Sequence, residues 1–221
     1  MKGVECENLI SFWSEQGFDK KIITAFKKVP REIFVSPELR SQAYEDRPLP
    51  TIRGQSLSQP TTVMIMTQAL EVAKGQKILE VGAGVGFQAT LLAELTGKRG
   101  TVFTTEIIPE LVEAAKKNTS HLGYHNVLVL ETDGSRGVEQ QAPFDRIIIT
   151  AACPKIPEPL IEQTKDQGII VAPLGNLQEQ ILVKARKIGH RLEMEFLGPF
   201  MFVPLQGKYG FEELNDYLTK N

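Results

Sequence analysis

The stretch that decides the fold is ILEVGAGVG, residues 78–86, in which three glycines follow an apolar run and precede a helical pattern. The run KILEV (77–81) has the composition of a buried strand, and Gln88–Thr96 has the apolar spacing of a helix. Glycines between a strand and a helix permit positive φ and let the backbone approach a ligand closely. Because open α/β sheets bind ligands at the carboxyl ends of their strands, this loop is the first candidate site.

The spacing of these glycines favours one class of cofactor. The dinucleotide fingerprint has the form GxGxxG, whereas Gly82, Gly84 and Gly86 have the form GxGxG and follow an acid, Glu80. This arrangement favours S-adenosylmethionine over a cofactor with a pyrophosphate. On this stretch alone, an ordinary tight turn between a strand and a helix is the alternative.

Two acids stand at the ends of the next two strands. Glu106 ends TVFTTE (101–106), at the same edge of the sheet as the glycines, where a carboxylate can accept hydrogen bonds from both ribose hydroxyls. NAD enzymes use an acid in the same place. Asp133 follows the third strand, where it can receive the exocyclic amine of an adenine, although Asp-Gly is also a common turn pair. Together, the glycine spacing and the two acids favour a methyl donor.

Beyond this loop, β-branched runs alternate with helical patterns. The further strands expected are 126–132, 144–150, 168–174, 180–187 and 190–198, and the crossover helices are 109–122 and 157–164. Such alternation is typical of a doubly wound, mostly parallel sheet with helices on both faces. The sequence therefore predicts an α/β protein with a Rossmann-like methyltransferase fold.

The two ends of the chain differ from this core. The N-terminal part has helical patterns at about 6–16 and 19–29, and the four prolines of VPREIFVSPELRSQAYEDRPLP then exclude long regular elements. Near the other end, MFVPLQGKYGFEELNDYL predicts a short strand and a terminal helix. We expect one methyltransferase domain over 1–221, made of an N-terminal arm (1–55), a cofactor-binding core (56–190) and a C-terminal, substrate-side extension (191–221).

Composition limits the partners. The 221 residues, of which 42% are hydrophobic, suit one globular domain. A net charge of −2 and the lack of a Lys/Arg block disfavour nucleic acid. No secretory h-region and no run of 18 apolar residues occur, so we expect a cytoplasmic protein without a membrane partner. The two cysteines and three histidines share no ligand spacing, so we expect neither a metal site nor a disulfide.

The stretch GQSLSQP (54–60) contains two serines and leads into an apolar helical pattern. Ser58 lies just before the expected helix start at Pro60, so the local sequence indicates a helix cap. A nucleophilic serine is a weaker hypothesis, because no general base is in view. Positioning of a substrate is the third possibility.

These motifs resemble those of the protein-L-isoaspartate O-methyltransferases. From about Val29 to Gly207 the chain has, in that family's order and spacing, VPREIFV, AYEDRPLP, GQSLSQP, ILEVGAGVGFQA, LGYHNVLV, TDGSRG, APFDRIIITAACPKIPEPLIEQ and FVPLQG. GQSLSQP and the late FVPL are not general methyltransferase features. The departures are small, such as Ser56 and Leu57 where the family often has Thr and Ile.

The resemblance implies transfer of a methyl group from S-adenosyl-L-methionine to the α-carboxylate of L-isoaspartyl residues in damaged proteins and peptides, with S-adenosyl-L-homocysteine as the product. It implies that Ser58 lies beside the reacting carboxylate as the catalytic residue. Peptide-binding residues implied in the same way are Val203, Pro204 and Leu205. The implied cofactor-binding residues are Gln55, Ser56, Leu57, Gly82, Ala83, Gly84, Gly86, Glu106, Ile107, Asp133, Gly134 and Thr150. A carboxylate is already nucleophilic at pH 7, so this reaction needs no base.

Three alternatives stay open. The first is an S-adenosylmethionine-dependent enzyme that acts on RNA or a small molecule. Against a base-modifying amino methyltransferase, TAACP (150–154) stands where such enzymes carry Asn/Asp-Pro-Pro-aromatic. The second is an NAD-dependent oxidoreductase, which the glycine spacing and the missing catalytic acid or base disfavour. The third, a cofactor-binding module without turnover, is separated from an enzyme only by an assay.

Overall fold

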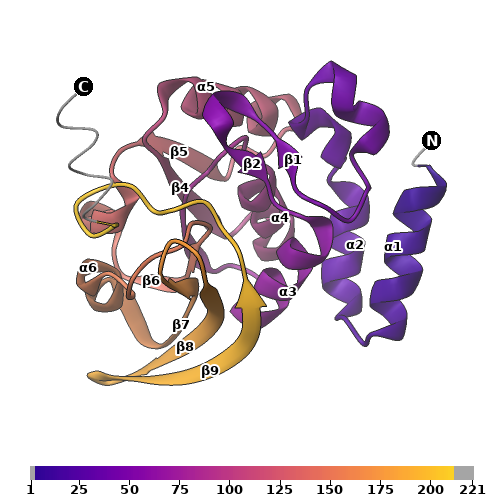
Figure 1. The fold of residues 1–221 in the computed structure, drawn as a ribbon. Coiled ribbons are helices and arrows are strands. Elements are labelled where there is room, and N and C mark those ends of the chain that lie inside the picture. Colours follow the sequence, from indigo (N-terminus) through magenta and orange to yellow (C-terminus); the bar gives the residue numbers. More distant parts are fainter. Residues whose placement is uncertain (1–2, 212–221) are drawn as a thin grey trace.

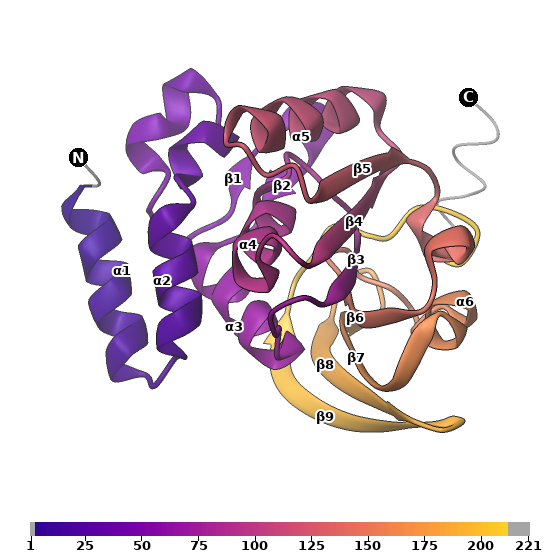
Figure 2. The ribbon, with the colours of Figure 1, turned by 180° about the vertical axis from the view of Figure 1, so that it is seen from behind.

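The computed structural model describes residues 3–211, and a seven-stranded sheet lies at their centre, in the order β5-β4-β3-β6-β7-β8-β9 (Figure 1). The strands are β3 (Lys77–Val81), β4 (Thr101–Glu106), β5 (Val127–Glu131), β6 (Phe144–Ile149), β7 (Thr164–Gly175), β8 (Gln180–Ile188) and β9 (Arg191–Phe200). The five strands β3, β4, β5, β6 and β7 pair in parallel, whereas β8 and β9 pair antiparallel at one edge of the sheet. Seen from behind, the parallel strands follow one another from β5 at the top to β7 (Figure 2). The predicted α/β fold is confirmed.

Alternate residues of the central strands enter two separate cores. On β3, Ile78 joins the core formed with the N-terminal arm and three helices, α3 (Pro60–Leu70), α4 (Phe87–Thr96) and α5 (Pro109–His121). Its neighbour Leu79 joins the core on the other face, together with Leu160 of the short helix α6 (Glu158–Glu162). Side chains of a strand point alternately to opposite faces, so apolar residues at consecutive positions require a sheet that is covered on both sides.

The strand β7 begins earlier than the sequence predicted. We expected a strand over 168–174, but Thr164 already pairs with Phe144 before the register shifts, and regular pairing resumes at Ile169. Residues 164–168 read TKDQG, and this polar stretch lacks the apolar pattern of a strand, so the first four residues of β7 were not apparent from the sequence. The other strands and helices predicted up to residue 198 are found within a few residues of their expected bounds.

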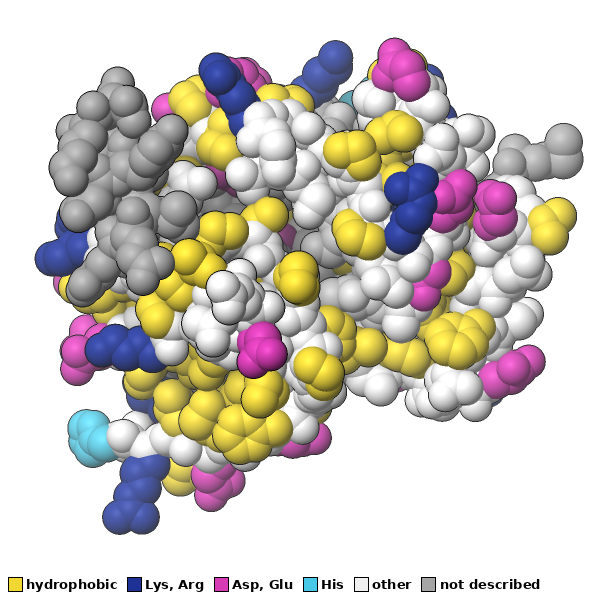
Figure 3. All heavy atoms as spheres, in the orientation of Figure 1, with side chains coloured by type: hydrophobic (Ala, Val, Ile, Leu, Met, Phe, Trp, Pro, Cys, Tyr) yellow, Lys and Arg dark blue, Asp and Glu magenta, His cyan; other side chains and the backbone are white. Residues whose placement is uncertain are grey.

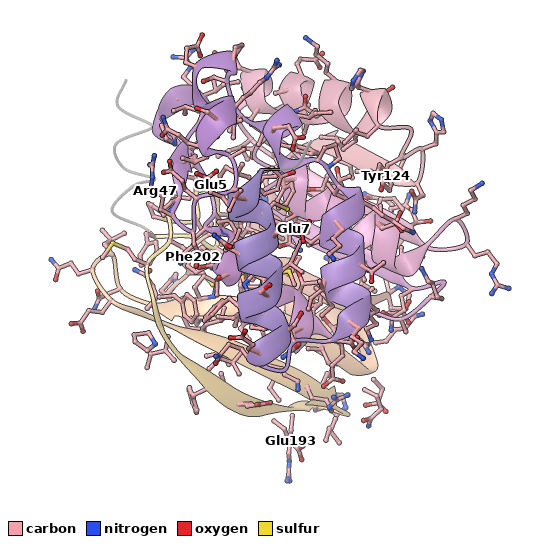
Figure 4. The ribbon with its side chains drawn as sticks, turned by 90° about the vertical axis from the view of Figure 1, so that its right-hand side faces the viewer. Glu5, Glu7, Arg47, Tyr124, Glu193 and Phe202 are labelled. Atoms are coloured by element: carbon pink, nitrogen blue, oxygen red, sulfur yellow. The ribbon has the colours of Figure 1, made fainter. Side chains whose placement is uncertain are left out.

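The N-terminal arm packs over α4. Its helices α1 (Val4–Glu15) and α2 (Lys20–Lys28) stand side by side in front of the core when the molecule is viewed from the arm (Figure 4). Trp13 contacts Phe26 edge to face at 4.8 Å between ring centroids, and Phe26 contacts Phe87 of α4 at 5.9 Å. Two short 3₁₀ helices follow, η1 (Arg31–Phe34) and η2 (Pro37–Gln42), as the prolines lead one to expect.

A small hairpin joins the arm to the core. Its strands are β1 (Leu49–Pro50) and β2 (Ser56–Leu57), which pair with each other and not with the large sheet. Between them lies the 3₁₀ turn η3 (Ile52–Gly54), in which Arg53 has a φ of 56°. The hairpin brings the GQSLSQP stretch to the carboxyl edge of the parallel strands.

The segment after β9 has little regular structure up to residue 211. The predicted short strand in MFVPLQG is reduced to one bridge, in which Pro204 pairs with Ala152. A proline cannot donate a ladder hydrogen bond, which limits regular pairing there. The predicted terminal helix falls outside the described residues. Within residues 3–211, no helix has the length and apolar character needed to cross a membrane.

Candidate active site

A pocket lies at the carboxyl ends of β3, β4 and β6. It encloses about 950 Å³, open space at its mouth included, and the molecule is visibly hollowed near the centre of this face (Figure 3). Most of its lining comes from four segments far apart in sequence: 55–58 of the hairpin, 80–88 around the glycines, 105–108 at and after the end of β4, and 203–206. A pocket at this edge of an α/β sheet is the usual place for a nucleotide-like ligand.

The structure brings most of the predicted site residues together in this pocket. Those that line it are Gln55, Ser56, Leu57, Ser58, Gly82, Ala83, Gly84, Glu106, Ile107, Gly134, Thr150, Val203, Pro204 and Leu205. Gly86 and Asp133 lie outside its lining. The sequence pattern therefore did not distinguish residues that line the pocket from residues that support its walls.

Gly82 and Gly86 are required for different reasons. Gly82 has a φ of 97°, and an added Cβ would lie 2.5 Å from Oγ1 of Thr150. That hydroxyl donates hydrogen bonds to the carbonyls of Val81 and Gly82, so Thr150 supports the start of the glycine loop. Gly86 has a φ of 91°, and its added Cβ would lie 3.2 Å from the backbone of Ala115 on α5. Gly86 therefore allows α4 to pack closely against α5.

Glu106 connects the glycine loop with the end of β4. Its Oε2 accepts a hydrogen bond from the Gly84 N–H at 2.9 Å, and its Oε1 accepts from the N–H groups of Ile107 and Ile108. An ionised carboxylate has about four acceptor positions, so three backbone bonds leave room for a ribose hydroxyl. The side chain lines the pocket and is almost fully buried.

We expect the Glu106→Ala variant to bind S-adenosylhomocysteine about 10-fold to 100-fold more weakly than the parent. The variant loses a hydrogen bond from a hydroxyl to a charged group, which contributes roughly 1.5–3 kcal/mol. Titration calorimetry measures the affinity. Glu106→Gln serves as the control, because it keeps an acceptor oxygen without the charge, and its affinity should fall between the other two. Parent-like affinity in Glu106→Ala would remove Glu106 from the cofactor site.

Asp133 occupies the turn after β5. Its Oδ1 accepts hydrogen bonds from the N–H and the hydroxyl of Ser135, and its Oδ2 accepts from the N–H of Lys208 at 2.9 Å. The carboxylate thus caps its own turn and fixes the segment that follows FVPL. Its neighbours Thr132 and Gly134 line the pocket. Contact between Asp133 and an adenine amine stays a prediction.

Glu80 is a pocket residue that the site prediction omitted. It is fully buried near the carboxyl end of β3, and Oε2 accepts a hydrogen bond from the Thr104 hydroxyl. Within residues 3–211, Oε1 has no hydrogen-bond partner. Burial raises the pKa of Glu80 to about 8; the Thr104 hydrogen bond opposes this rise and the charge of Glu106 adds to it. An acid inside the apolar run KILEV was the sequence signal that could have identified it.

Replacing Glu80 with Gln should change how stability depends on pH. In the folded protein its pKa is about 8, above the ordinary value of 4.5, so folding takes up a proton between these values. Stability from this group is therefore complete below about pH 4.5 and is lost as the pH rises toward 8. Relative to Glu80→Gln, the free energy of unfolding of the ligand-free parent should decrease by on the order of 2–3 kcal/mol between pH 5 and pH 8. Denaturant unfolding of both proteins at several pH values measures this; a constant difference would contradict it.

Ser58 does not cap α3. The cap position is Gln59, and no side chain there makes a capping hydrogen bond. Instead, Asp46 of the N-terminal arm accepts hydrogen bonds from the N–H of Thr61 at 2.9 Å and from its hydroxyl at 2.7 Å. No described residue is hydrogen-bonded to the Ser58 hydroxyl, which lies at the pocket wall. The local-sequence hypothesis of a cap is wrong because a residue distant in sequence serves the helix end.

Several apolar and polar pocket residues were not among the predicted site residues. They are Val63, Met66, Phe87, Gln88, Thr105, Ile108, Leu111, Thr132, Ala151 and Gln206. Each lies within a few residues of a predicted site segment or on α3, where the spacing of Val63 and Met66 is that of one helix face. No group of three or more His, Cys, Asp or Glu in the described part of the chain could hold a metal ion.

Comparison with known proteins decides the family. The family model described as protein-L-isoaspartate(D-aspartate) O-methyltransferase matches residues 5–210. The chain belongs to this family. Protein-L-isoaspartate O-methyltransferase 1 of Archaeoglobus fulgidus is 46% identical over 202 residues, which cover 91% of this chain and 93% of that protein. The enzyme of the same name from Methanothrix thermoacetophila is 44% identical, covering 94% and 95% of the two chains.

Solved structures of this methyltransferase family have the same fold. One protein-L-isoaspartate O-methyltransferase is similar over 97% of this chain and 69% of its own, with a TM-score of 0.85 and 28% identity. A putative family member from Plasmodium falciparum, in complex with S-adenosyl-L-homocysteine, is similar over 91% and 98% of the two chains, with a TM-score of 0.80. At 19% identity, the second likeness concerns the fold alone.

Proposed function

We propose that the protein methylates the α-carboxylate of L-isoaspartyl residues in damaged proteins and peptides, with S-adenosylmethionine as the donor. The observation that carries this proposal is the meeting of four segments in one pocket. GQSLSQP and FVPL, the stretches that are specific to the family, face the glycine loop and Glu106. The ester so formed can collapse to a succinimide, whose hydrolysis returns some normal aspartate.

The charges of the pocket fit a cationic ligand. Among the lining residues the ionisable side chains are Glu106 and Glu80, and none is Lys, Arg or His. With its pKa at about 8, Glu80 is mostly protonated at pH 7 in the ligand-free protein, and a cation bound beside it favours its ionised form. Glu80 also presents a buried oxygen without a partner among the described residues. Such a lining suits an ammonium or sulfonium group and offers no basic side chain to a pyrophosphate. The NAD alternative is therefore less well supported than it was from sequence.

When bound, S-adenosylmethionine supplies a methyl group activated by a sulfonium. Glu106 and the backbone of the glycine loop would hold the nucleoside part, and Glu80 would face the cationic end. The Ser58 hydroxyl is free to donate a hydrogen bond to the substrate carboxylate and to direct one oxygen toward the donor. A carboxylate needs no deprotonation, so catalysis consists mainly of such positioning, which can lower a barrier by on the order of 7–11 kcal/mol.

The FVPL segment is held in an extended form beside the pocket. The N–H of Ala152 donates to the Val203 carbonyl at 2.8 Å, and the N–H of Leu205 donates to the Ala152 carbonyl at 2.7 Å. These bonds occupy the backbone edge that faces Ala152, so a peptide substrate would meet the opposite side of the segment. Backbone contacts of this kind accept many side chains, as repair of varied proteins requires.

The experiment that tests this function is transfer of label from methyl-labelled S-adenosylmethionine. The expected result is label on an L-isoaspartyl peptide and none on RNA. Label on RNA alone would mean that RNA is the methyl acceptor. No label on either substrate, with S-adenosylhomocysteine still bound, would mean that the protein binds the cofactor without turnover. A cytoplasmic location and the absence of nucleic-acid, membrane and metal partners stay predictions.

A further inference from the structure

Arg31 in the N-terminal arm is a buried charge close to the pocket but outside its lining. Its Nε donates a hydrogen bond to the Ala43 carbonyl at 2.7 Å, and its Nη2 donates to the Ser58 carbonyl at 2.7 Å. The guanidinium carbon lies 5.0 Å from the ring centroid of Phe87, the first residue of α4. One side chain therefore contacts the arm, the GQSLSQP stretch and the helix after the glycine loop.

The surroundings of Arg31 are unfavourable for a charge. No carboxylate of the described residues forms an ion pair with it, and its buried Nη1 has no hydrogen-bond partner among them. Burial lowers the pKa of Arg31 to about 9, against the opposing effects of Tyr44 and Asp46, so the group is still charged at pH 7. Well-packed apolar side chains often stabilise a fold more than incompletely paired buried charges. Stability alone is thus a poor explanation for Arg31.

The backbone at Ser58 is a point that needs support. Strands β1 and β2 have two residues each and stand apart from the large sheet. Asp46 fixes the chain only from Thr61 onward. Within the described residues, Arg31 supplies the hydrogen bond that the Ser58 carbonyl accepts.

We propose that Arg31 is a positioning residue for methyl transfer, because its hold on the Ser58 carbonyl fixes the direction of the Ser58 hydroxyl. This inference rests on the proposed function. Without that hydrogen bond the Ser58 peptide unit can rotate and carry the hydroxyl away from the carboxylate. A displacement of about 1 Å in a reacting group can lower the rate by about 100-fold.

The test compares Arg31→Met and Arg31→Lys with a matched control, Arg146→Met. Arg146 is partly buried, whereas Arg31 is fully buried, and like Arg31 it donates to backbone carbonyls, those of Leu70 at 2.7 Å and Asp145 at 2.8 Å. It contacts the opposite end of α3 and does not line the pocket. Its replacement removes the same kind of hydrogen bond without touching Ser58.

We expect Arg31→Met to lower kcat for an L-isoaspartyl peptide by about 10-fold to 100-fold at a temperature where the variant is folded. Calorimetry should give an affinity for S-adenosylhomocysteine within about threefold of the parent's, because the cofactor contacts are intact. Arg146→Met should lower the melting temperature and leave kcat near the parent's. Equal losses of kcat in the two variants would overturn the proposal.

A double-mutant cycle tests whether Arg31 acts through Ser58. In a Ser58→Ala background, Arg31→Met should lower kcat by less than about threefold, because the group that it positions is already missing. A full additional loss would overturn the proposal. If Arg31→Met fails to fold, Arg31→Lys provides the test. One ammonium group cannot donate to both the Ala43 and the Ser58 carbonyls as the guanidinium does, so the kcat of Arg31→Lys should fall. A parent-like kcat in Arg31→Lys would overturn the proposal. An inactive parent would refute the proposed function itself.

Discussion

An L-isoaspartyl peptide should be methylated at least about 100-fold faster than its L-aspartyl isomer, because the free carboxylate of the aspartyl isomer lies one methylene farther from the peptide chain. In isoaspartate the α-carboxylate branches directly from the chain, whereas the aspartate carboxylate stands one methylene farther out. Ser58 and the FVPL segment both line the pocket, and hydrogen bonds with other segments hold their backbones. A site with walls fixed in this way accepts a carboxylate at one distance from the peptide.

The comparison uses two synthetic peptides that differ only in this linkage, at equal concentrations and with the same labelled donor. Initial rates of label transfer give kcat/KM for each isomer. Neither peptide contains another aspartate, so that label from a second aspartate side chain does not contribute to the measured rates. Equal rates on the two isomers would contradict the assignment of the acceptor, whatever the cofactor.

Much of the fold was predictable because the signals lie within single elements. KILEV and TVFTTE are strands at their predicted bounds, since consecutive β-branched and apolar residues suit a sheet buried on both faces. The glycine loop was also predictable, because the φ values of Gly82 and Gly86 and the close neighbours of both residues strongly favour glycine. The hairpin β1–β2 was missed, because two-residue strands have no periodicity to detect.

The pocket was only partly predictable, because some of its support comes from distant residues. Asp46 caps α3 from 15 positions away, and Arg31 holds the Ser58 carbonyl from 27 positions away. A local pattern can suggest that a serine caps a helix, but it cannot show that an aspartate from another segment already does so. At Asp133, by contrast, the local pattern was informative. Asp-Gly indicated a turn, and the structure shows Asp133 accepting a hydrogen bond from the Ser135 N–H within that turn.

Ser58→Ala should reduce kcat for the isoaspartyl peptide by roughly 10-fold to 150-fold, since a hydrogen bond to a charged group contributes about 1.5–3 kcal/mol. Stability should change by no more than about 0.5 kcal/mol, because the hydroxyl is bonded to none of the described residues and Asp46 caps the helix. Calorimetry should give an unchanged affinity for S-adenosylhomocysteine.

Ser56→Ala is the matched control for Ser58→Ala. Ser56 belongs to the same hairpin and lines the same pocket, but it is exposed and is assigned to the cofactor, so its loss should affect kcat less. A Ser58→Ala protein with parent-like turnover and a lower melting temperature would make the serine purely structural. A methyl or acyl adduct trapped on Ser58 would instead mean covalent catalysis, which is disfavoured because no base among the described residues is hydrogen-bonded to the Ser58 hydroxyl. Only loss of turnover with stability and cofactor affinity retained agrees with a hydroxyl that directs the carboxylate.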